Sequence, residues 1–160
     1  MAFVNIYFSL GSNLGDRERN ITEALRRMDE AFEGHYLALS KLIETKPMGF
    51  VGGKFLNAAV LYRTYRTEGT PEKAALKVLD KIKVIERDMG RLDPPEYDSE
   101  GNRIYKSRVI DIDILFYGTE RIDIERLTIP HKGIKNRPFV MVPLREIAKP
   151  SLRKAFPEYF

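Results

Sequence analysis

The chain has 160 residues and no cysteine, and its 27 Lys and Arg residues exceed its 23 Asp and Glu residues, which gives a formal net charge of +4. This length suffices for one domain with one core, so we expect a single domain over residues 1–160. The lack of cysteine excludes a disulfide framework, and no apolar run approaches the length of a membrane span, so we expect a cytoplasmic protein without membrane contact. The mild positive charge favours anionic ligands without selecting a nucleic acid, a nucleotide or an anionic lipid.

The first elements predicted along the chain are a buried strand and a helix. The nearly unbroken apolar run FVNIYFSL predicts a strand that ends at the tight loop GSNLGD. Apolar residues at helical spacing then predict a helix from about Arg17 to Phe32, with Asp16 as its N-cap.

Two more strands and a second helix follow. One strand is expected around Tyr36 to Ile43 and another over FLNAAVLYRTYRT, with the loop KPMGFVGGK between them because it holds proline and three glycines. Thr70 and Pro71 are typical of a helix start, and the helix EKAALKVLDKIKVIERDMG is expected to end at Gly90.

The remaining chain completes an α+β pattern. RLDPPEYDSEGNRIYKS shows no periodicity, and a loop of this length is usually functional or disordered. RVIDIDILFYG predicts a strand, RIDIERLTIPH an extended segment, and PFVMVPLREIA a short helix. The order β-α-β-β-α-β with a C-terminal extension predicts a ferredoxin-like fold, in which helices pack on a mainly antiparallel sheet. Fold alone does not assign a function.

Two carboxylates, Asp111 and Asp113, interrupt the apolar strand RVIDIDILFYG. Since β-branched residues alternate with them, both side chains are expected on one face, roughly 6.5 to 7 Å apart along the strand. The alternation is compatible with a solvated face, as on many antiparallel sheets. It is also compatible with a shared Mg²⁺ site, because Mg²⁺ binds through one or two carboxylates and keeps water and phosphates as its other ligands.

Basic residues near these aspartates are candidate phosphate ligands. Arg91 opens the long loop and Arg108 closes it, and the guanidinium fork matches phosphate oxygens. Arg108 could instead only neutralise the aspartates. His131 stands among Arg126, Lys132, Lys135 and Arg137, a set of donors suited to a triphosphate, or it is a loop histidine with no ligand. GSNLGD lacks the lysine and hydroxyl positions of a Walker A motif and the three-glycine spacing of a dinucleotide fingerprint, and it also fits a plain strand-to-helix turn.

Six motifs in order, GSNLG, ETKPMG, FLNAAV, RVIDIDILFYG, LTIPH and KNRPFV, closely resemble the 6-hydroxymethyl-7,8-dihydropterin pyrophosphokinase family of folate biosynthesis. They run from Gly11 to about Pro143, nearly the whole chain. The resemblance implies an ATP-dependent diphosphotransferase that transfers pyrophosphate from ATP to the hydroxymethyl oxygen of the dihydropterin and releases AMP. It also implies two Mg²⁺ ions held by Asp111 and Asp113.

The resemblance also implies roles for other residues. Arg91 and Arg108 are similar to the family's phosphate-contacting arginines and count with the two aspartates as catalytic. The residues similar to the ATP-binding set are Lys83, Glu86, Ile114, Arg126, Thr128, His131 and Arg137. The residues similar to the pterin-binding set are Thr45, Lys46 and Met48, which offer backbone groups, Asn57, whose amide reads the pterin edge, and Phe55 and Phe139, the aromatic walls.

The chain departs from the family pattern mainly in its long loop. Asp93 stands where many relatives have a further arginine, Tyr105 stands for a usual tryptophan, and Arg103 or Lys106 could supply the missing charge. Phe55 replaces a common tyrosine and lacks its hydroxyl.

We expect a monomer that acts on two small molecules, ATP and the pterin, and binds no nucleic acid. Two alternatives stay open on the residues alone. One is an RNA-binding ferredoxin-like domain, although two aspartates on the sheet face would repel phosphates without metal. The other is a metal-dependent nucleotide hydrolase.

Overall fold

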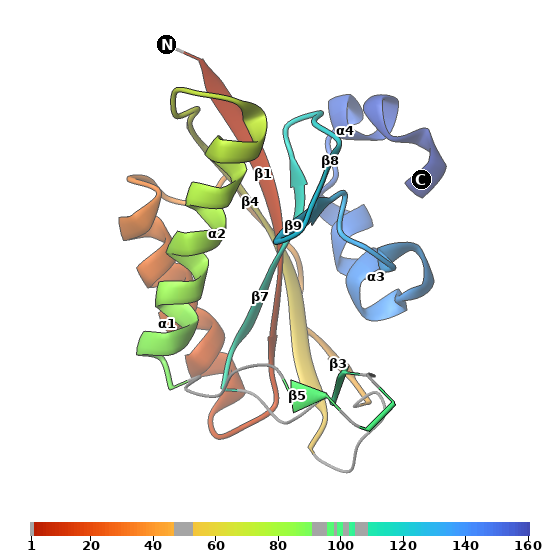
Figure 1. Cartoon of the computed structure of the whole chain (residues 1–160). Helices are drawn as coiled ribbons and strands as arrows, with labels where there is room; N and C mark the ends of the chain where they lie inside the picture. Colours follow the sequence, from red (N-terminus) through yellow and green to blue (C-terminus); the bar gives the residue numbers. More distant parts are fainter. Residues whose placement is uncertain (1, 47–52, 91–95, 98, 101–102, 105–108) are drawn as a thin grey trace.

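The computed structural model describes residues 2–46, 53–90, 96–97, 99–100, 103–104 and 109–160. Two long helices divide the strands of the first two thirds of the chain, and the last third adds a hairpin and short helices (Figure 1). The strands are β1 (Phe3–Ser12), β2 (Ala38–Leu39), β3 (Ile43–Thr45), β4 (Phe55–Tyr65), β5 (Glu96–Tyr97), β6 (Arg103–Ile104), β7 (Asp111–Tyr117), β8 (Ile122–Ile124) and β9 (Leu127–Ile129). The helices are α1 (Arg17–Ala31), α2 (Pro71–Asp88), α3 (Pro138–Ile147) and α4 (Pro150–Ala155), with 3₁₀ turns η1 (Ile134–Asn136) and η2 (Pro157–Tyr159).

The main sheet has the order β2-β4-β1-β7, with β3 also pairing β4, and all these pairs are antiparallel. This arrangement confirms the predicted antiparallel α+β fold. The expected strand at 36–43 is instead two short strands, β2 and β3. The expected extended segment RIDIERLTIPH is a hairpin, because β8 and β9 pair with each other.

Both long helices begin at the residues that the sequence predicts. The Asp16 carboxylate accepts the backbone N–H of Arg19 at 3.1 Å, and the Thr70 hydroxyl accepts that of Lys73 at 3.2 Å. Each cap satisfies an N–H group that lacks a partner in the first turn of a helix. These caps therefore fix where each helix leaves the preceding loop.

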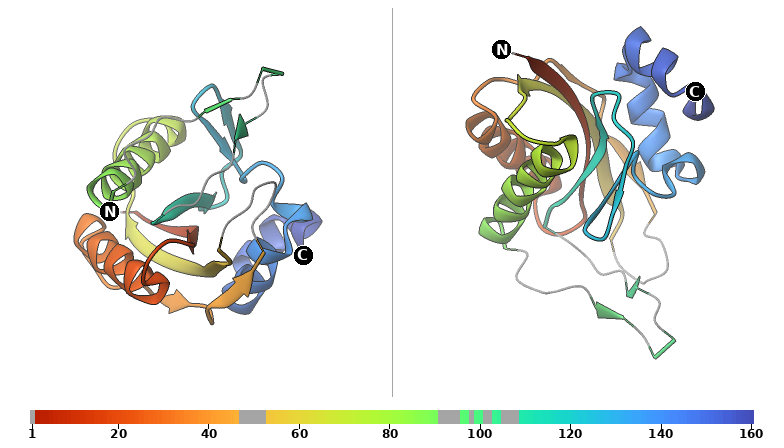
Figure 2. Two further views of the ribbon diagram at one scale, coloured as in Figure 1. Left: turned by 90° about the horizontal axis from the view of Figure 1, so that it is seen from below. Right: turned by 45° about the horizontal axis from the view of Figure 1, so that its top comes forward.

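The sheet is covered on both faces, α1 and α2 lying on one and α3 and α4 on the other (Figures 1 and 2). Ile112 and Ile114 of β7 belong to the core cluster under α1 and α2. Leu115 and Phe116 belong to the cluster under α3 and α4. Two consecutive residues can share this face because the β1–β7 register shifts at Leu115, and this bulge turns Phe116 to the same side as Leu115.

Candidate active site

Asp111 and Asp113 lie at the start of β7, on the sheet face that carries α3 and α4 further along. Asp111 pairs with Gly11 and Asp113 with Ser9 of β1, so both carboxylates share a face with these small residues. Both aspartates are half-buried, and Asp113 keeps 42% of its side chain exposed. The next residues of β7 on this face, Leu115 and Phe116, are apolar. The face is thus polar at the end of the sheet that carries Gly11, Asn57 and Asp111.

A row of three residues crosses the sheet at this end. Gly11 pairs with Asn57 of β4 on one side and with Asp111 of β7 on the other, which places all three on one face. A Cβ on Gly11 would lie 3.0 Å from Oδ1 of Asn57 and 3.5 Å from Cδ1 of Phe55. Glycine therefore leaves an open strip between the predicted pterin-reading amide and the first aspartate.

The predicted pterin residues gather at this strip. Asn57 is buried and donates through Nδ2 to Oγ1 of Thr45 at 2.6 Å, which fixes the orientation of its amide. Phe55 precedes Asn57 by two residues on the same face of β4 and is half-buried. Phe139 lies at the start of α3, packed against the cluster on that face. Lys46 is exposed at the end of the described segment.

A pocket of about 290 Å³ lies beside Asp113. Its lining brings together most of the predicted nucleotide residues, namely Lys83, Ile114, Arg126, Thr128 and His131. His131 Nε2 lies 3.8 Å from Oδ1 of Asp113, so the β9 end of the pocket adjoins the aspartates. Arg126 forms an ion pair with Asp80, with 2.8 Å between Nη2 and Oδ1, and both side chains are more than half exposed.

Two predicted nucleotide residues do not line this pocket. Glu86 is only 2% exposed, and its carboxylate accepts the backbone N–H of Ile112 at 2.9 Å and lies 3.2 Å from Nζ of Lys83. It therefore supports the strand between the two aspartates. Arg137 precedes α3, where its guanidinium lies close to Gly133.

Several residues near the site have no distinctive sequence signal. Leu79 of α2 and Glu125 line the nucleotide pocket, and Gly11 and Ser9 carry the open strip. Their roles depend on strand register and helix packing. GSNLGD marked the neighbourhood of Gly11 but did not indicate that Asn57 and Asp111 would flank it.

Some predicted residues lie outside the part of the chain that the structure describes. These are Arg91, Arg108 and Met48, together with Asp93, Tyr105 and Lys106 of the long loop, and the side chain of Arg103.

The aspartate pair fits a magnesium ion. Both side chains supply hard carboxylate oxygens from one face, Asp113 opens into the nucleotide pocket, and Mg²⁺ is usually held by one or two carboxylates together with substrate phosphates. Among the described residues, no group of three or more His, Cys, Asp or Glu side chains gathers as a metal site.

Comparisons with known proteins converge on one family. The family model described as 7,8-dihydro-6-hydroxymethylpterin-pyrophosphokinase (HPPK) matches residues 7–149. A 2-amino-4-hydroxy-6-hydroxymethyldihydropteridine pyrophosphokinase of Haemophilus influenzae is 36% identical over 91% of this chain and 82% of its own length. One of Porphyromonas gingivalis is 37% identical over 89% of this chain and 90% of its own. A folate synthesis bifunctional protein of Arabidopsis thaliana is 36% identical, and the match spans 27% of its length.

Solved structures share the fold. An HPPK-DHPS in complex with substrates matches 99% of this chain with a TM-score of 0.63 and 16% identity, and the Plasmodium falciparum HPPK-DHPS gives the same values. This chain spans less than half of those two chains, 43% and 41% respectively.

Proposed function

This chain belongs to the 7,8-dihydro-6-hydroxymethylpterin-pyrophosphokinase family and is an ATP-dependent transferase of pyrophosphate to hydroxymethyldihydropterin in folate synthesis, and we propose that Asp111 and Asp113 hold its Mg²⁺. The observation that carries this assignment is the position of the pair. Asp113 opens into the pocket with the predicted nucleotide residues, and Asp111 shares a row with Gly11 and Asn57.

The reaction joins the hydroxymethyl oxygen of the pterin to the β-phosphorus of ATP. The bond between that phosphorus and the oxygen bridging to the α-phosphate breaks, AMP leaves, and the hydroxyl proton passes to solvent. Such transfers need little covalent help from a protein, so catalysis consists mainly of positioning and charge neutralisation. The residues that matter are therefore those that hold the two substrates in line.

On the nucleotide side, Lys83, Arg126 and His131 supply the cationic or hydrogen-bonding groups. They line the pocket beside Asp113, so a triphosphate bound there has its phosphates close to the aspartates. Arg126 exchanges Asp80 for a phosphate, an exchange that costs little because an exposed ion pair contributes little stability. Ile114 and Thr128 contribute the apolar and hydroxyl parts of the same lining.

On the pterin side, Asn57 reads the hydrogen-bonding edge of the ring and Phe55 and Phe139 flank its faces. Asn57 and Asp111 are two strand spacings apart, roughly 10 Å, which is enough for a bicyclic ring held at Asn57 to direct its hydroxymethyl group toward Asp111. Thr45 holds the amide in the required orientation. We assign Lys46 and Met48 to backbone contacts with the pterin on the family resemblance.

Bound Mg²⁺ supplies Lewis acidity at the transferring phosphate and lowers the pKa of the attacking hydroxyl. Asp111 and Asp113 hold it on the polar end of the sheet face, and Glu86 keeps the strand between them in place. We assign Arg91 and Arg108 to neutralising the charge that develops on the phosphates, and Arg137 to the ATP set, on the family resemblance.

The test replaces each aspartate by asparagine and follows AMP and pterin diphosphate with saturating MgATP and 6-hydroxymethyl-7,8-dihydropterin. Each of Asp111→Asn and Asp113→Asn is expected to lower turnover by at least about 10²-fold, because the charge that holds the ion is lost. Calorimetric titration with a non-hydrolysable ATP analogue should show a loss of Mg²⁺-dependent binding in the same variants. Asp88→Asn, an exposed change at the end of α2, is the matched control.

Near-normal turnover in either aspartate variant would overturn the metal assignment. Formation of ADP, or release of pyrophosphate without pterin, would contradict the reaction itself and would favour a nucleotide hydrolase.

The finer expectations stay predictions. These are two Mg²⁺ ions per site, a monomer, a single domain over 1–160 and a cytoplasmic location. In the described part of the chain, no helix is both long enough and apolar enough to cross a membrane.

A further inference from the structure

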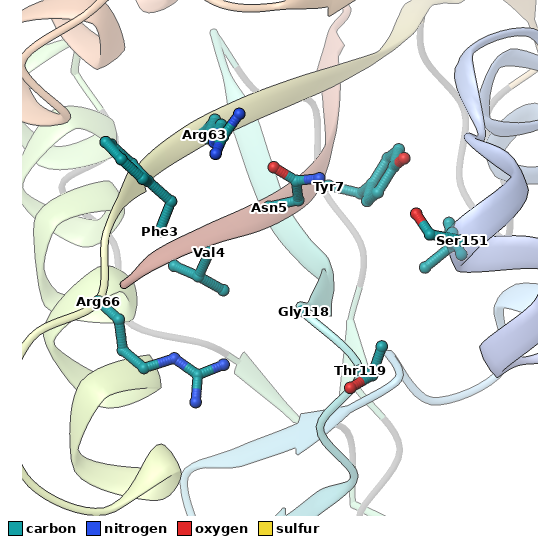
Figure 3. A pocket seen from close by; sticks show the side chains of 10 residues that line it. Phe3, Val4, Asn5, Tyr7, Arg63, Arg66, Gly118, Thr119 and Ser151 are labelled. Atoms are coloured by element: carbon teal, nitrogen blue, oxygen red, sulfur yellow. The ribbon is translucent and has the colours of Figure 1, made fainter. Parts of the chain in front are cut away.

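A second pocket, of about 380 Å³, lies at the opposite end of the same sheet face (Figure 3). Asn5 and Tyr7 of β1 and Arg63 of β4 line it from the sheet, and Ser151 of α4 lines it from the other side. Asn5 and Gly11 are six residues apart on β1, which is about 20 Å at the rise of a strand. This second pocket is therefore separate from the aspartate site.

The second pocket is positively charged. Among the described residues, Arg63 and Arg66 line it and no acidic residue does. Arg63 lies over the ring of Phe3, 4.6 Å from its centre, and no described carboxylate forms an ion pair with it. Arg66 has one acidic neighbour, Glu120, at 3.6 Å. Two guanidinium groups thus border one cavity and Glu120 offsets part of their charge, which leaves a net positive charge that favours an anion.

The backbone of the turn after β7 keeps Arg66 at this rim. Gly118 has a φ of +55°, and a Cβ there would lie 3.5 Å from Nη2 of Arg66 and 3.3 Å from Cγ2 of Val4. The guanidinium therefore lies across Gly118, which has no side chain to displace it. Figure 3 shows Arg66 extending toward this turn.

Neutral donors complete the lining from three elements. Asn5 offers an amide, Thr119 and Ser151 offer hydroxyls, and Tyr7 offers a phenol that is 2% exposed. The Tyr7 oxygen accepts the backbone N–H of Lys149 at 3.1 Å, and no acceptor for its proton is found in the described chain. Burial raises the pKa of Tyr7, so the phenol keeps this proton and can donate it.

We propose that this second pocket binds a small phosphate monoester, with its phosphate against Arg63 and Arg66 and its organic part toward Tyr7 and α4. Two guanidinium groups and several neutral donors exceed what the two oxygens of one carboxylate can accept, whereas a phosphate dianion offers three terminal oxygens. The volume is in the range of ligand sites, so it admits a phosphate with a small organic group.

The test is a titration of ¹⁵N-labelled protein without Mg²⁺ or nucleotide, using glycerol 3-phosphate, inorganic phosphate and uncharged glycerol in separate arms. Saturable shifts are expected in the amide signals of Gly118, Thr119 and Ser151 with glycerol 3-phosphate, and not with glycerol. A higher dissociation constant for inorganic phosphate than for glycerol 3-phosphate would show that the organic part contributes. Equal dissociation constants for the two ligands would contradict an ester ligand and leave only a phosphate site.

The double variant Arg63→Gln, Arg66→Gln is expected to weaken this binding by at least about ten-fold, since charge-assisted hydrogen bonds are lost. Arg19→Gln, an exposed arginine on α1, should bind like the wild type. If the double variant is misfolded, Thr119→Glu serves instead, because it adds a like charge at an exposed position of the turn. Shifts confined to Asp113 and His131, or unchanged binding in the folded variants, would overturn the proposal.

Discussion

At the scale of single residues, Gly11 leaves space between Asn57 and Asp111, because the three residues form one row across three strands. Gly11→Ala should weaken pterin binding by about ten-fold or more, since the new Cβ would lie 3.0 Å from Oδ1 of Asn57 and the amide must shift. Titration with the pterin and with an ATP analogue measures this, and the nucleotide affinity should change less.

Gly34→Ala is the matched control for this change, because a Cβ there meets nothing within 4 Å. If Gly11→Ala leaves pterin affinity unchanged, the open strip has no role in binding the ring.

The residues of the site differ in how far the sequence predicted them. Asp111 and Asp113 were predictable as a pair because alternation alone places them on one face, and the structure confirms that placement. The role of Gly11 was not predictable, because the space that it leaves depends on which residues of β4 and β7 lie opposite it. Cross-strand register is a long-range property that no local pattern of GSNLGD contains.

At the scale of elements, α1 is tied to both sides of the segment 47–52. Arg17 donates to the backbone carbonyl of Lys54 at 2.9 Å and also binds the Glu44 carboxylate, while Asn13 donates to the carbonyl of Gly53 at 3.2 Å. Arg17→Gln should therefore weaken pterin binding several-fold, about three- to ten-fold, because these ties hold the ends of a predicted substrate loop. Calorimetry with the pterin measures the effect, and Arg19→Gln is the control.

The Arg17 tie also predicts a pH dependence. The Arg17 guanidinium, through its hydrogen bond, holds the pKa of Glu44 below its ordinary value. The ion pair therefore stabilises the fold fully above the ordinary glutamate pKa, about 4.3, and this stabilisation is lost as the pH falls through the lowered pKa. The difference in unfolding free energy between wild type and Arg17→Gln should shrink in acid. A difference that grows in acid would contradict this sign.

Glu86 connects α2 to the strand that carries the aspartates. Glu86→Ala leaves the buried N–H of Ile112 without its acceptor and should cost about 1–3 kcal/mol of unfolding free energy. Glu86→Gln keeps an acceptor and should cost less. Urea unfolding measures both, and Glu30→Ala on the exposed side of α1 is the control. Equal costs for the alanine and glutamine variants would show that the charge, not the hydrogen bond, matters.

The long elements were predictable and the short ones were not. α1 and α2 have caps and helical periodicity in the sequence, and they begin at Arg17 and Pro71 as expected. The segment 36–43 lacks such signals, and β2 and β3 exist because β4 offers a long edge to pair with. Pairing partners distant in the chain decide short strands.

At the scale of the whole molecule, the second face of the sheet is covered by the C-terminal segment. The predicted element order describes the sheet with α1 and α2, but α4 has only six residues, too few for a periodic signal. The family match ends at residue 149, just before α4. Phe156 after α4 nevertheless packs on Phe116 of β7, with ring centres 5.0 Å apart. The residues after α4 therefore pack on the main sheet, against β7, the strand that carries the two aspartates.

This continuity predicts how a change in the C-terminal cluster affects the whole chain. Phe156 is fully buried, so Phe156→Ala should lower the unfolding free energy by about 3–5 kcal/mol, whereas Phe3→Ala, at a ring 47% exposed, should cost much less. Because β7 contributes side chains to both clusters, urea unfolding should remain a single transition at a lower midpoint. Turnover in buffer should stay near wild type, since Phe156 lies at the opposite end of the sheet from Asp111. A separate early transition would instead mean that α4 and η2 unfold independently of the sheet.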